Sequence, residues 1–458
     1  MAVELHPFLE TDTRPSPNWW YVLSISGSSP SMRVGHTATF VQAVHSDEHD
    51  KVFIIGGANP EQVFNEVYVL DLVVRSWDTL EAPGFRGRYE HSAFCVKNRP
   101  GVLFVFGGAT QSGSLNDVQS MNISSGVWSD VEVSGTLPAP RTHHSCAVIG
   151  SHVYFYSGGH IGPDPVGDRR VHCLDTSTMS WQSITPLNSP KPRHGHLMVS
   201  YNNRIFLHGG VSGSTFYDDL FILDPDRNSW ASIKKKKTAP SPRAAHGGII
   251  SNKDIFMFGG MNKSGALNEG YKFNTEMNTW SKLELEGPPP SNRLDFAICT
   301  IPLRVPVSSL KLSQKSQTDL TALSTKALHV LDPELKPDCT SSGDSTSDNA
   351  IVVESACAQE IDIITNGQQT STDGNRSMAE QNAQQTIIDS NCSTAEQKVD
   401  IQKGQQASTH SNCSEAEQKA DIQNGQLVPD TEEVTMILIN GGMDTEGEIF
   451  DDTLVLML

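Results

Sequence analysis

Five histidines recur at intervals of about 50 residues, and they are the side chains of this 458-residue sequence whose spacing most suggests chemistry. They are His36, His91, His144, His196 and His246. Imidazoles that meet at equivalent positions of a repeated fold could bind a metal ion or an anion. The alternative is a packing role, in which each histidine hydrogen-bonds to the backbone of its own repeat. Because packing repeats with the fold whereas function usually breaks its symmetry, we favour the packing role.

Other residue patterns that support catalysis are missing. The sequence has no Gly-x-Ser-x-Gly elbow, no Gly-x-x-x-x-Gly-Lys phosphate loop, no Gly-x-Gly-x-x-Gly and no His-Glu-x-x-His. Its eight cysteines include no Cys-x-x-Cys pair, which argues against a zinc site and a disulfide framework. Four lie in strand-like segments, where a buried inert thiol is the usual role: Cys95, Cys146, Cys173 and Cys299. We therefore predict no catalytic residue, no cofactor and no metal site, and we expect that the protein is not an enzyme.

The histidines belong to a longer repeat. An arginine lies three residues before each histidine, and a sixth arginine precedes Phe296 in the same way; the six are Arg33, Arg88, Arg141, Arg193, Arg243 and Arg293. We expect each arginine to pair with a neighbouring repeat. Glycine pairs end an apolar run at Gly56-Gly57, Gly107-Gly108, Gly158-Gly159, Gly209-Gly210, Gly259-Gly260 and Gly441-Gly442. A tryptophan follows at Trp77, Trp128, Trp181, Trp230 and Trp280, where we expect it to pack on an outer strand.

Each repeat contains four short strand-like segments, here called a to d in chain order. In the second repeat they are Ser92–Val96, Val102–Phe106, Val118–Ile123 and Trp128–Val133. These segments are rich in β-branched and aromatic residues and are bounded by Gly, Pro, Asn and Asp. Four strands in about 50 residues are typical of a β-propeller blade.

The sixth repeat lacks its own strand d and tryptophan. Its strand a follows Arg293, and its strands b and c are Met436–Ile439 and Leu454–Leu458. The missing strand is found before the first repeat, at Trp20–Ile25. The sequence therefore predicts an all-β, six-bladed propeller in which the N-terminal strand completes the last blade and removes two open sheet edges.

Composition divides the chain into segments. Residues 303–433 contain no Phe, Tyr or Trp and carry 20 acidic against 9 basic residues, a pattern typical of disorder. We predict an N-terminal tail at 1–19, a propeller at 20–302, a disordered acidic insertion at 303–433 and the last propeller strands at 434–458. Within the insertion, Asn391–Lys398 recurs as Asn412–Lys419, either through expansion of a tolerated loop or as a multivalent, phosphorylatable tether.

Charge and hydropathy exclude several partners. A net charge of −19 disfavours binding to nucleic acid. No apolar run approaches the ~20 residues that span a bilayer. Residues 1–14 lack the apolar core of a secretory signal. We expect a cytoplasmic protein with reduced cysteines and no transmembrane segment.

Strand alternation sorts the loops, because the b–c and d–a loops must lie at one face of the ring and the a–b and c–d loops at the other. The insertion occupies an a–b loop, so we expect the opposite face, the b–c face, to bind a protein partner. Its candidate contact residues are Phe64, Arg86, Phe216, Tyr217, Lys235, Lys236 and Phe450. The alternatives are that the aromatic residues fold each loop against its own blade and that Lys234–Lys237 form a solvated loop.

The succession Arg-x-x-His, apolar-Gly-Gly, Asn/Asp-acid and Trp resembles the kelch repeat. More narrowly, Gly56–Pro60, Arg88–His91, Arg193–His196 and Gly441–Asp452 resemble kelch proteins that act as effectors of the Rab GTPase of late endosomes. The resemblance implies a noncatalytic protein that binds the GTP-bound Rab, associates peripherally with endosome membranes and supports endosome-to-trans-Golgi vesicle transport and receptor recycling. The alternatives are another kelch scaffold, such as a substrate receptor of a larger complex, and an oxidase-type propeller enzyme.

Overall fold

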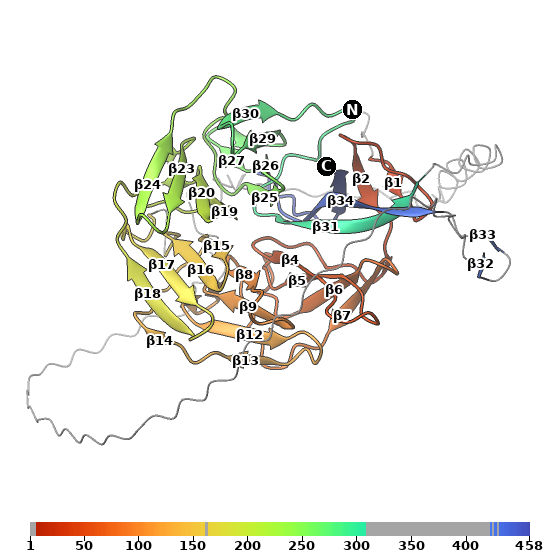
Figure 1. The fold of residues 1–458 in the computed structure, drawn as a ribbon, viewed down its shortest axis with the longest axis horizontal. Helices are drawn as coiled ribbons and strands as arrows, with labels where there is room; N and C mark the ends of the chain where they lie inside the picture. Colours follow the sequence, from red (N-terminus) through yellow and green to blue (C-terminus); the bar gives the residue numbers. More distant parts are fainter. Residues whose placement is uncertain (1–5, 161–163, 308–421, 424–425, 428–429) are drawn as a thin grey trace, which may run out of the picture. The chain divides into compact units, whose positions relative to one another are not determined.

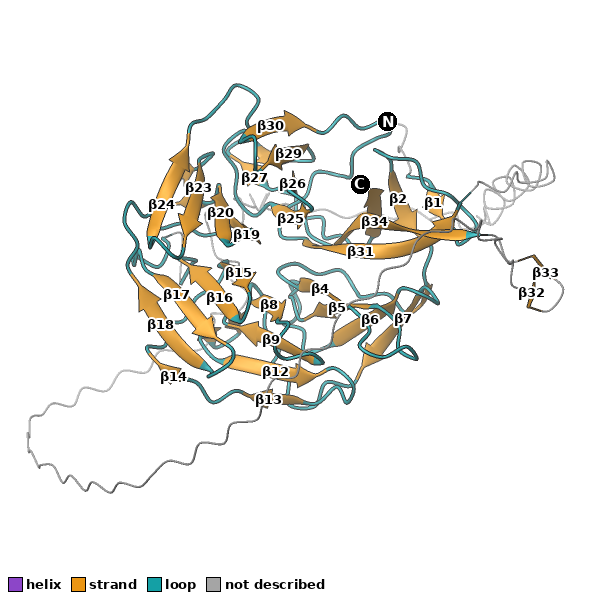
Figure 2. Cartoon of the chain, in the orientation of Figure 1, coloured by secondary structure: helices purple, strands orange, loops and turns teal. Residues whose placement is uncertain are grey.

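The computed structural model describes residues 6–160, 164–307, 422–423, 426–427 and 430–458. The chain divides into two compact units, Met1–Ile363 with Pro429–Leu458, and Ile364–Val428. In the second unit the described residues form one antiparallel pair, β32 (Ile422–Gln423) and β33 (Gln426–Leu427). The part of the chain that the structure describes holds no helix long and apolar enough to cross a membrane. All of the elements in the described ranges are strands, as Figure 2 shows.

The described residues of the first unit form six sheets of four or five strands arranged around a common axis (Figure 1), and the four main strands of each sheet are antiparallel. The innermost strands, a, are β4 (Thr37–Val41), β8 (Ser92–Cys95), β15 (Ser145–Ile149), β19 (Leu197–Tyr201), β25 (Gly247–Ser251) and β31 (Ala297–Pro306). The b strands are β5 (Lys51–Ile55), β9 (Val102–Phe106), β16 (His152–Tyr156), β20 (Arg204–His208), β26 (Asp254–Phe258) and β34 (Thr431–Asn440). The c strands are β6 (Val67–Asp71), β12 (Val118–Asn122), β17 (Val171–Asp175), β23 (Leu220–Asp224), β29 (Gly270–Asn274) and β35 (Thr453–Met457). The outer d strands are β7 (Ser76–Leu80), β13 (Trp128–Asp130), β18 (Ser180–Ile184), β24 (Ser229–Ile233), β30 (Thr279–Lys282) and β2 (Trp20–Leu23).

The six sheets are the predicted blades, numbered here 1 to 6 in the order of their arginines. Blade 6 combines β31, β34 and β35 with the N-terminal β2. β2 pairs antiparallel with β35, and Trp20 lies opposite Leu456. The predicted six-bladed ring and its closure by the N-terminal strand are confirmed, and β31 packs beside β4 where the ring closes.

Blade 6 extends beyond the limits predicted for the insertion. β31 and β34 each have ten residues and pair from Ala297–Asn440 out to Pro306–Thr431. The alternating side chains of Ile301, Leu303 and Val305 are buried, so apolar alternation continues after the last aromatic residue. Residues 303–306 and 431–433 therefore belong to the propeller. The predicted limits of the insertion, which followed the absence of aromatic residues, cut through β31 and β34. Within the rest of the insertion, the structure describes only β32, β33 and the end residues 307 and 430. The predicted disorder of its other residues lies outside the described residues.

Short outer strands are further additions to the predicted blades. β1 (Phe8–Leu9) runs parallel to β2 in blade 6, and Leu9 is fully buried. The predicted N-terminal tail at 1–19 thus contributes a fifth strand to the last blade. β3 (Ser26–Gly27) and β14 (Ser134–Gly135) add similar fifth strands to blades 1 and 3.

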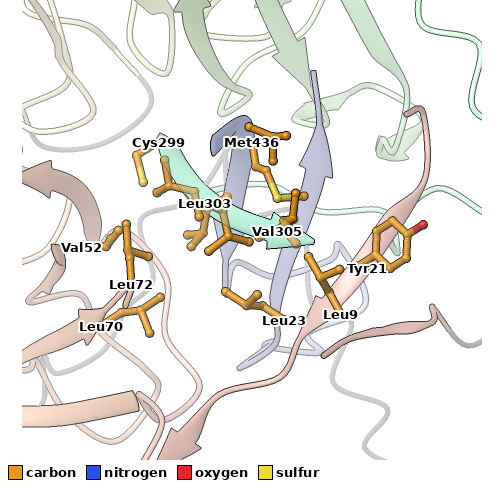
Figure 3. Close-up of a cluster of buried hydrophobic side chains, with 14 of the residues drawn as sticks. Leu9, Tyr21, Leu23, Val52, Leu70, Leu72, Cys299, Leu303, Val305 and Met436 are labelled. Carbon is orange, nitrogen blue, oxygen red and sulfur yellow. The ribbon is translucent and has the colours of Figure 1, made fainter. Parts of the chain in front are cut away.

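The hydrophobic cores lie between blades. Figure 3 shows the cluster at the closure, in which side chains of blade 6 meet Val52, Leu70 and Leu72 of blade 1. The six repeated tryptophans are all buried, as predicted. Trp230 of blade 4 packs against Tyr156 of blade 3, with ring centroids 5.5 Å apart. Trp20 packs against Phe258 of blade 5 in the same way, at 5.3 Å. The tryptophans therefore join each blade to its predecessor and make the ring one packed body.

Candidate functional site

The repeated arginines are buried anchors at the b–c face. In blade 2, the Arg88 guanidinium donates to the carbonyl of Gly107 at 3.0 Å and forms a two-point pair with Asp117 at 2.9 Å. Arg88 is fully buried, and the Asp117 carboxylate neutralises its charge where water cannot solvate it. Each partner belongs to blade 2 itself. The anchor therefore ties the start of strand a to the b–c loop of the same blade.

The other five arginines form equivalent anchors. The carbonyl acceptors belong to Gly56, Ser157, Gly209, Gly259 and Gly441. The acids are Glu66, Asp168, Asp219, Glu269 and Asp452. Because every side-chain partner lies in the arginine's own blade, the expected pairing with a neighbouring blade is wrong. The neighbouring contact is made by the backbone instead, as when the Gly57 N–H donates to the Arg88 carbonyl.

Blade 3 departs from the glycine register. Arg141 donates to the carbonyl of Ser157, and the Gly158 N–H donates to the Arg193 carbonyl as the second glycine does elsewhere. Ser157 therefore takes the place of the first glycine, with a φ of 50° that L-residues rarely adopt. Its hydroxyl accepts a hydrogen bond from the Arg193 N–H at 2.8 Å.

Two of the repeated histidines hydrogen-bond to side chains of the preceding blade. His36 Nε2 lies 3.0 Å from Asn440 Oδ1 of blade 6, and His91 Nε2 lies 3.2 Å from Thr37 Oγ1 of blade 1. A Cβ at Gly107 would lie 2.8 Å from His144 Cε1, so glycine makes room for the next blade's imidazole. Phe296 packs on Gly259 in the same way. These contacts are packing contacts, and those of His36 and His91 are made with the preceding blade instead of the backbone of their own blade.

These imidazoles are neutral at physiological pH. Burial, reinforced by a nearby arginine, lowers the pKa of His36 and of His196 to about 3. Burial also lowers the pKa of His91, His144 and His246 well below the usual value. They therefore add no positive charge to the interior.

A closed ring of backbone hydrogen bonds surrounds the axis at the b–c face. It is formed by the residues just before the histidine position, here called the axial ring: Gly35, Glu90, His143, Gly195, Ala245 and Asp295. Each N–H donates to the carbonyl of the preceding blade's residue at 2.7–3.2 Å, and the Gly35 N–H donates to Asp295 to close the circle. All six residues have positive φ. The backbone of this ring repeats although its side chains do not.

Three titratable side chains of the axial ring converge. One ligand atom from each of Glu90, His143 and Asp295 lies within 4.8 Å of the others. His143 Nε2 is 3.4 Å from Glu90 Oε1. Burial raises the pKa of Glu90 to about 8, and burial together with the Glu90 carboxylate raises that of Asp295 to about 8. These three residues are not shared among the repeats, so the repeat pattern in the sequence does not point to them.

A cavity of about 130 Å³ lies at the axial ring. Its lining includes the three titratable residues together with the repeated histidines and Phe296. His144 is 5% exposed, and neither of its ring nitrogens has a hydrogen-bond partner among the described residues. Small β-hairpins in b–c loops stand beside the axial ring: β10 (Ala109–Thr110) with β11 (Gly113–Ser114), β21 (Val211–Ser212) with β22 (Thr215–Phe216), and β27 (Met261–Asn262) with β28 (Gly265–Ala266).

Three of the aromatic residues predicted to contact a partner instead support the anchors. The Arg33 guanidinium lies 4.1 Å from the ring centre of Phe64, which is 3% exposed. Tyr217 lies 4.1 Å from the guanidinium of Arg193, and Phe450 lies 4.5 Å from that of Arg293. These are cation–π contacts within one blade. Phe64 is thus a packing residue, while Tyr217 and Phe450 are half-buried beneath the loops.

The remaining candidates lie at the b–c face. Arg86 is 45% exposed and pairs with Asp117, the acid of the Arg88 anchor. Lys235 is 51% exposed and pairs with Asp218, while Lys236 is exposed. Phe216 is half-buried against a small apolar cluster of Ala245, Met261 and Leu294. The exposed cations of this set come from the d–a loops after blades 1 and 4, so the structure does not gather the predicted residues into one patch.

The four propeller cysteines are free thiols in strands. Burial raises the pKa of Cys95, Cys146, Cys173 and Cys299 to about 12. At physiological pH they are protonated and poor nucleophiles.

The repeat, the anchors and the ring define a kelch propeller. The family model described as the KLHDC2/KLHL20/DRC7 Kelch-repeats domain matches residues 41–260 and 167–309. The chain therefore belongs to the kelch-repeat family.

Similarity to particular members is found over about half of the chain. The chain is 44% identical over 216 residues to the Rab9 effector protein with kelch motifs of Rattus norvegicus, covering 47% of this chain and 58% of that protein. It is 42% identical over 216 residues to the Homo sapiens protein of that name, with the same coverage of 47% and 58%. It is 28% identical over 221 residues to Kelch domain-containing protein 3 of Bos taurus, covering 45% of this chain and 55% of that protein. The matches thus span less than two thirds of these relatives' own length.

Proposed function

We propose that this protein is a noncatalytic effector that binds a GTP-bound Rab GTPase through the b–c face of its propeller. The observation that carries the proposal is the 42–44% identity to proteins named as Rab9 effectors. A Rab changes the order of its switch loops with the bound nucleotide, so a partner that contacts those loops distinguishes GTP from GDP. The proposed setting is endosome-to-trans-Golgi transport and receptor recycling, with a cytoplasmic protein held peripherally at endosome membranes by its Rab.

The b–c face is the proposed contact surface because its loops vary while the anchors beneath them hold the frame. Exposed cations at Arg86, Lys235 and Lys236 offer contacts to an acidic partner. Half-buried Phe216 offers an apolar contact where it packs on Ala245, Met261 and Leu294. The buried thiols and neutral histidines described above support a binding role rather than a catalytic one.

Binding of the full chain to immobilised Rab9 loaded with a nonhydrolysable GTP analogue or with GDP tests the proposal. We expect binding to the GTP form that is at least ~10-fold tighter, because only that form presents ordered switch loops. Equal binding to both forms, or binding to neither, would refute the proposed effector role.

A charge reversal tests the proposed face. Lys235→Glu with Lys236→Glu should weaken binding to the GTP form, with the largest effect at low salt. Lys97 is an exposed lysine in the a–b loop of blade 2, on the opposite face, so Lys97→Glu is the matched control. If the control weakened binding as much as the double variant, the b–c face would not be the contact surface.

A further inference from the structure

We propose that the axial ring binds one divalent transition-metal ion through the carboxylates of Glu90 and Asp295 and the Nε2 atom of His143. This site is separate from the proposed contacts to a Rab and does not depend on them. It also differs from the ring of five repeated histidines considered in the sequence analysis.

The geometry of the three side chains fits such an ion. First-row metals bind nitrogen and oxygen ligands at about 2.0–2.2 Å, which places two ligands of a tetrahedral ion about 3.4 Å apart. His143 Nε2 and Glu90 Oε1 are 3.4 Å apart, and Asp295 lies within 4.8 Å of both. One imidazole with two carboxylates favours a transition metal over Mg²⁺ or Ca²⁺, which prefer oxygen ligands.

Neighbouring residues orient the three side chains and leave space for them. His143 Nδ1 lies 3.2 Å from the hydroxyl of Thr142, a contact that can set the tautomer in which Nε2 coordinates a metal. A Cβ at Gly35, between Asp295 and Glu90 in the ring, would lie 2.7 Å from Glu90 Oε1. Glycine at this position therefore leaves space for the carboxylate. The backbone ring of hydrogen bonds holds all three residues in place.

The electrostatics also favour a cation. The arginines nearest in sequence to the three ligands each pair with the acid of their own anchor. Within the described residues, neither Glu90 nor Asp295 forms an ion pair with a lysine or arginine. The unpartnered nitrogens of His144 line the same cavity, where they can hydrogen-bond to water that completes the coordination of an ion.

Zinc binding to the chelator-treated full chain tests the proposal. We expect one Zn²⁺ per chain by calorimetry at this site, a rise in Tm with Zn²⁺, and no comparable effect of Mg²⁺. Glu90→Gln and Asp295→Asn should each weaken that binding by at least ~10-fold, since loss of an outer-shell partner already costs 10–100-fold. Glu61→Gln, which changes an exposed carboxylate in the blade 1 b–c loop, should leave it unchanged.

Two outcomes would overturn the assignment. A wild-type chain that binds no Zn²⁺ would exclude the site. Zinc binding that survives unchanged in both Glu90→Gln and Asp295→Asn would place the ion elsewhere in the chain. Both substitutions nearly preserve side-chain volume, so we expect the variants to fold. Circular dichroism of the metal-free variants checks this and separates loss of binding from loss of folding.

Discussion

The arginine anchors and the axial ring lie next to each other in every blade but differ in symmetry. Each anchor contains a buried arginine, a carbonyl near the end of strand b and an acid before strand c. The axial ring repeats only its backbone, and its side chains are two glycines, an alanine, a glutamate, a histidine and an aspartate. The anchor contacts are therefore required by every blade. The side chains of the ring are free to differ, and there three titratable groups meet at one place.

Removing an anchor should produce the largest change in stability. Arg88→Met leaves Asp117 and the Gly107 carbonyl without their buried donor, which should lower the free energy of unfolding by about 4 kcal/mol. Arg86→Met is the matched control, because Arg86 pairs with the same Asp117 but is 45% exposed. The free energy of unfolding of Arg86→Met should fall by less than ~1 kcal/mol. Chemical denaturation measures both, and equal losses would show that burial of the anchor is not what stabilises the blade.

Truncation at the ring closure should cost slightly less. Trp20→Ala removes a side chain that is 1% exposed and packed on Phe258, for an expected loss of about 3 kcal/mol. Trp230→Ala makes the same change in blade 4, which is continuous in sequence. Since both residues pack on the preceding blade in similar geometry, the losses should agree within ~1 kcal/mol. A much smaller loss for Trp20→Ala would mean that blade 6 opens before the rest of the ring.

The axial ring should make stability depend on pH in a way that the anchors do not. The pKa of Glu90 and of Asp295 is raised to about 8, so the folded chain binds protons more tightly than the unfolded chain. The stability from these protons is complete below the unfolded pKa near 4 and is lost as pH rises toward 8. The titratable group that faces them is His143, and the repeated imidazole of His36 nearby is neutral.

Glu90→Gln should remove part of this alkaline loss, making the variant more stable than wild type at pH 8 by roughly 1–2 kcal/mol. The acid limb should remain, because the pKa of the buried histidines is lowered in the folded chain. Below pH 6.5 the unfolded chain binds protons at these histidines that the folded chain does not bind, so stability falls. Thermal unfolding in chelator at pH 5–9 measures both limbs. An unchanged alkaline limb in Glu90→Gln would show that the two carboxyls do not titrate together in this range.

The repeated part of the fold could be predicted from the sequence because the same residue pattern recurs in each blade. The spacing of arginine, glycine pair and tryptophan was sufficient for six blades and for the closure by Trp20. β1 and β3 were missed because two residues carry no periodic signal, and the insertion limits were misplaced because Leu303 and Val305 continue the strand without aromatic residues.

The axial ring could not be derived in this way. Glu90, His143 and Asp295 are far apart in sequence and do not repeat, so only closure of the ring brings them together. One signal was present in the sequence, since the position before each histidine is one of the two variable positions of Arg-x-x-His and carries the titratable exceptions Glu90, His143 and Asp295. Reading the exceptions within a repeat, rather than its consensus, would have identified the three residues.

Ser157 allows the smallest test, at the one anchor that departs from glycine. Ser157→Ala keeps the positive φ and removes the hydroxyl that accepts from the Arg193 N–H, so it should cost about 1–3 kcal/mol. Ser157→Gly loses the same acceptor but relieves the backbone strain, worth roughly 1 kcal/mol. We therefore expect the glycine variant to be more stable than the alanine variant by about 1 kcal/mol in chemical denaturation. If the two were equally stable, the positive φ at Ser157 would carry no strain, and the serine would differ from the glycine of other blades only in its hydrogen bond.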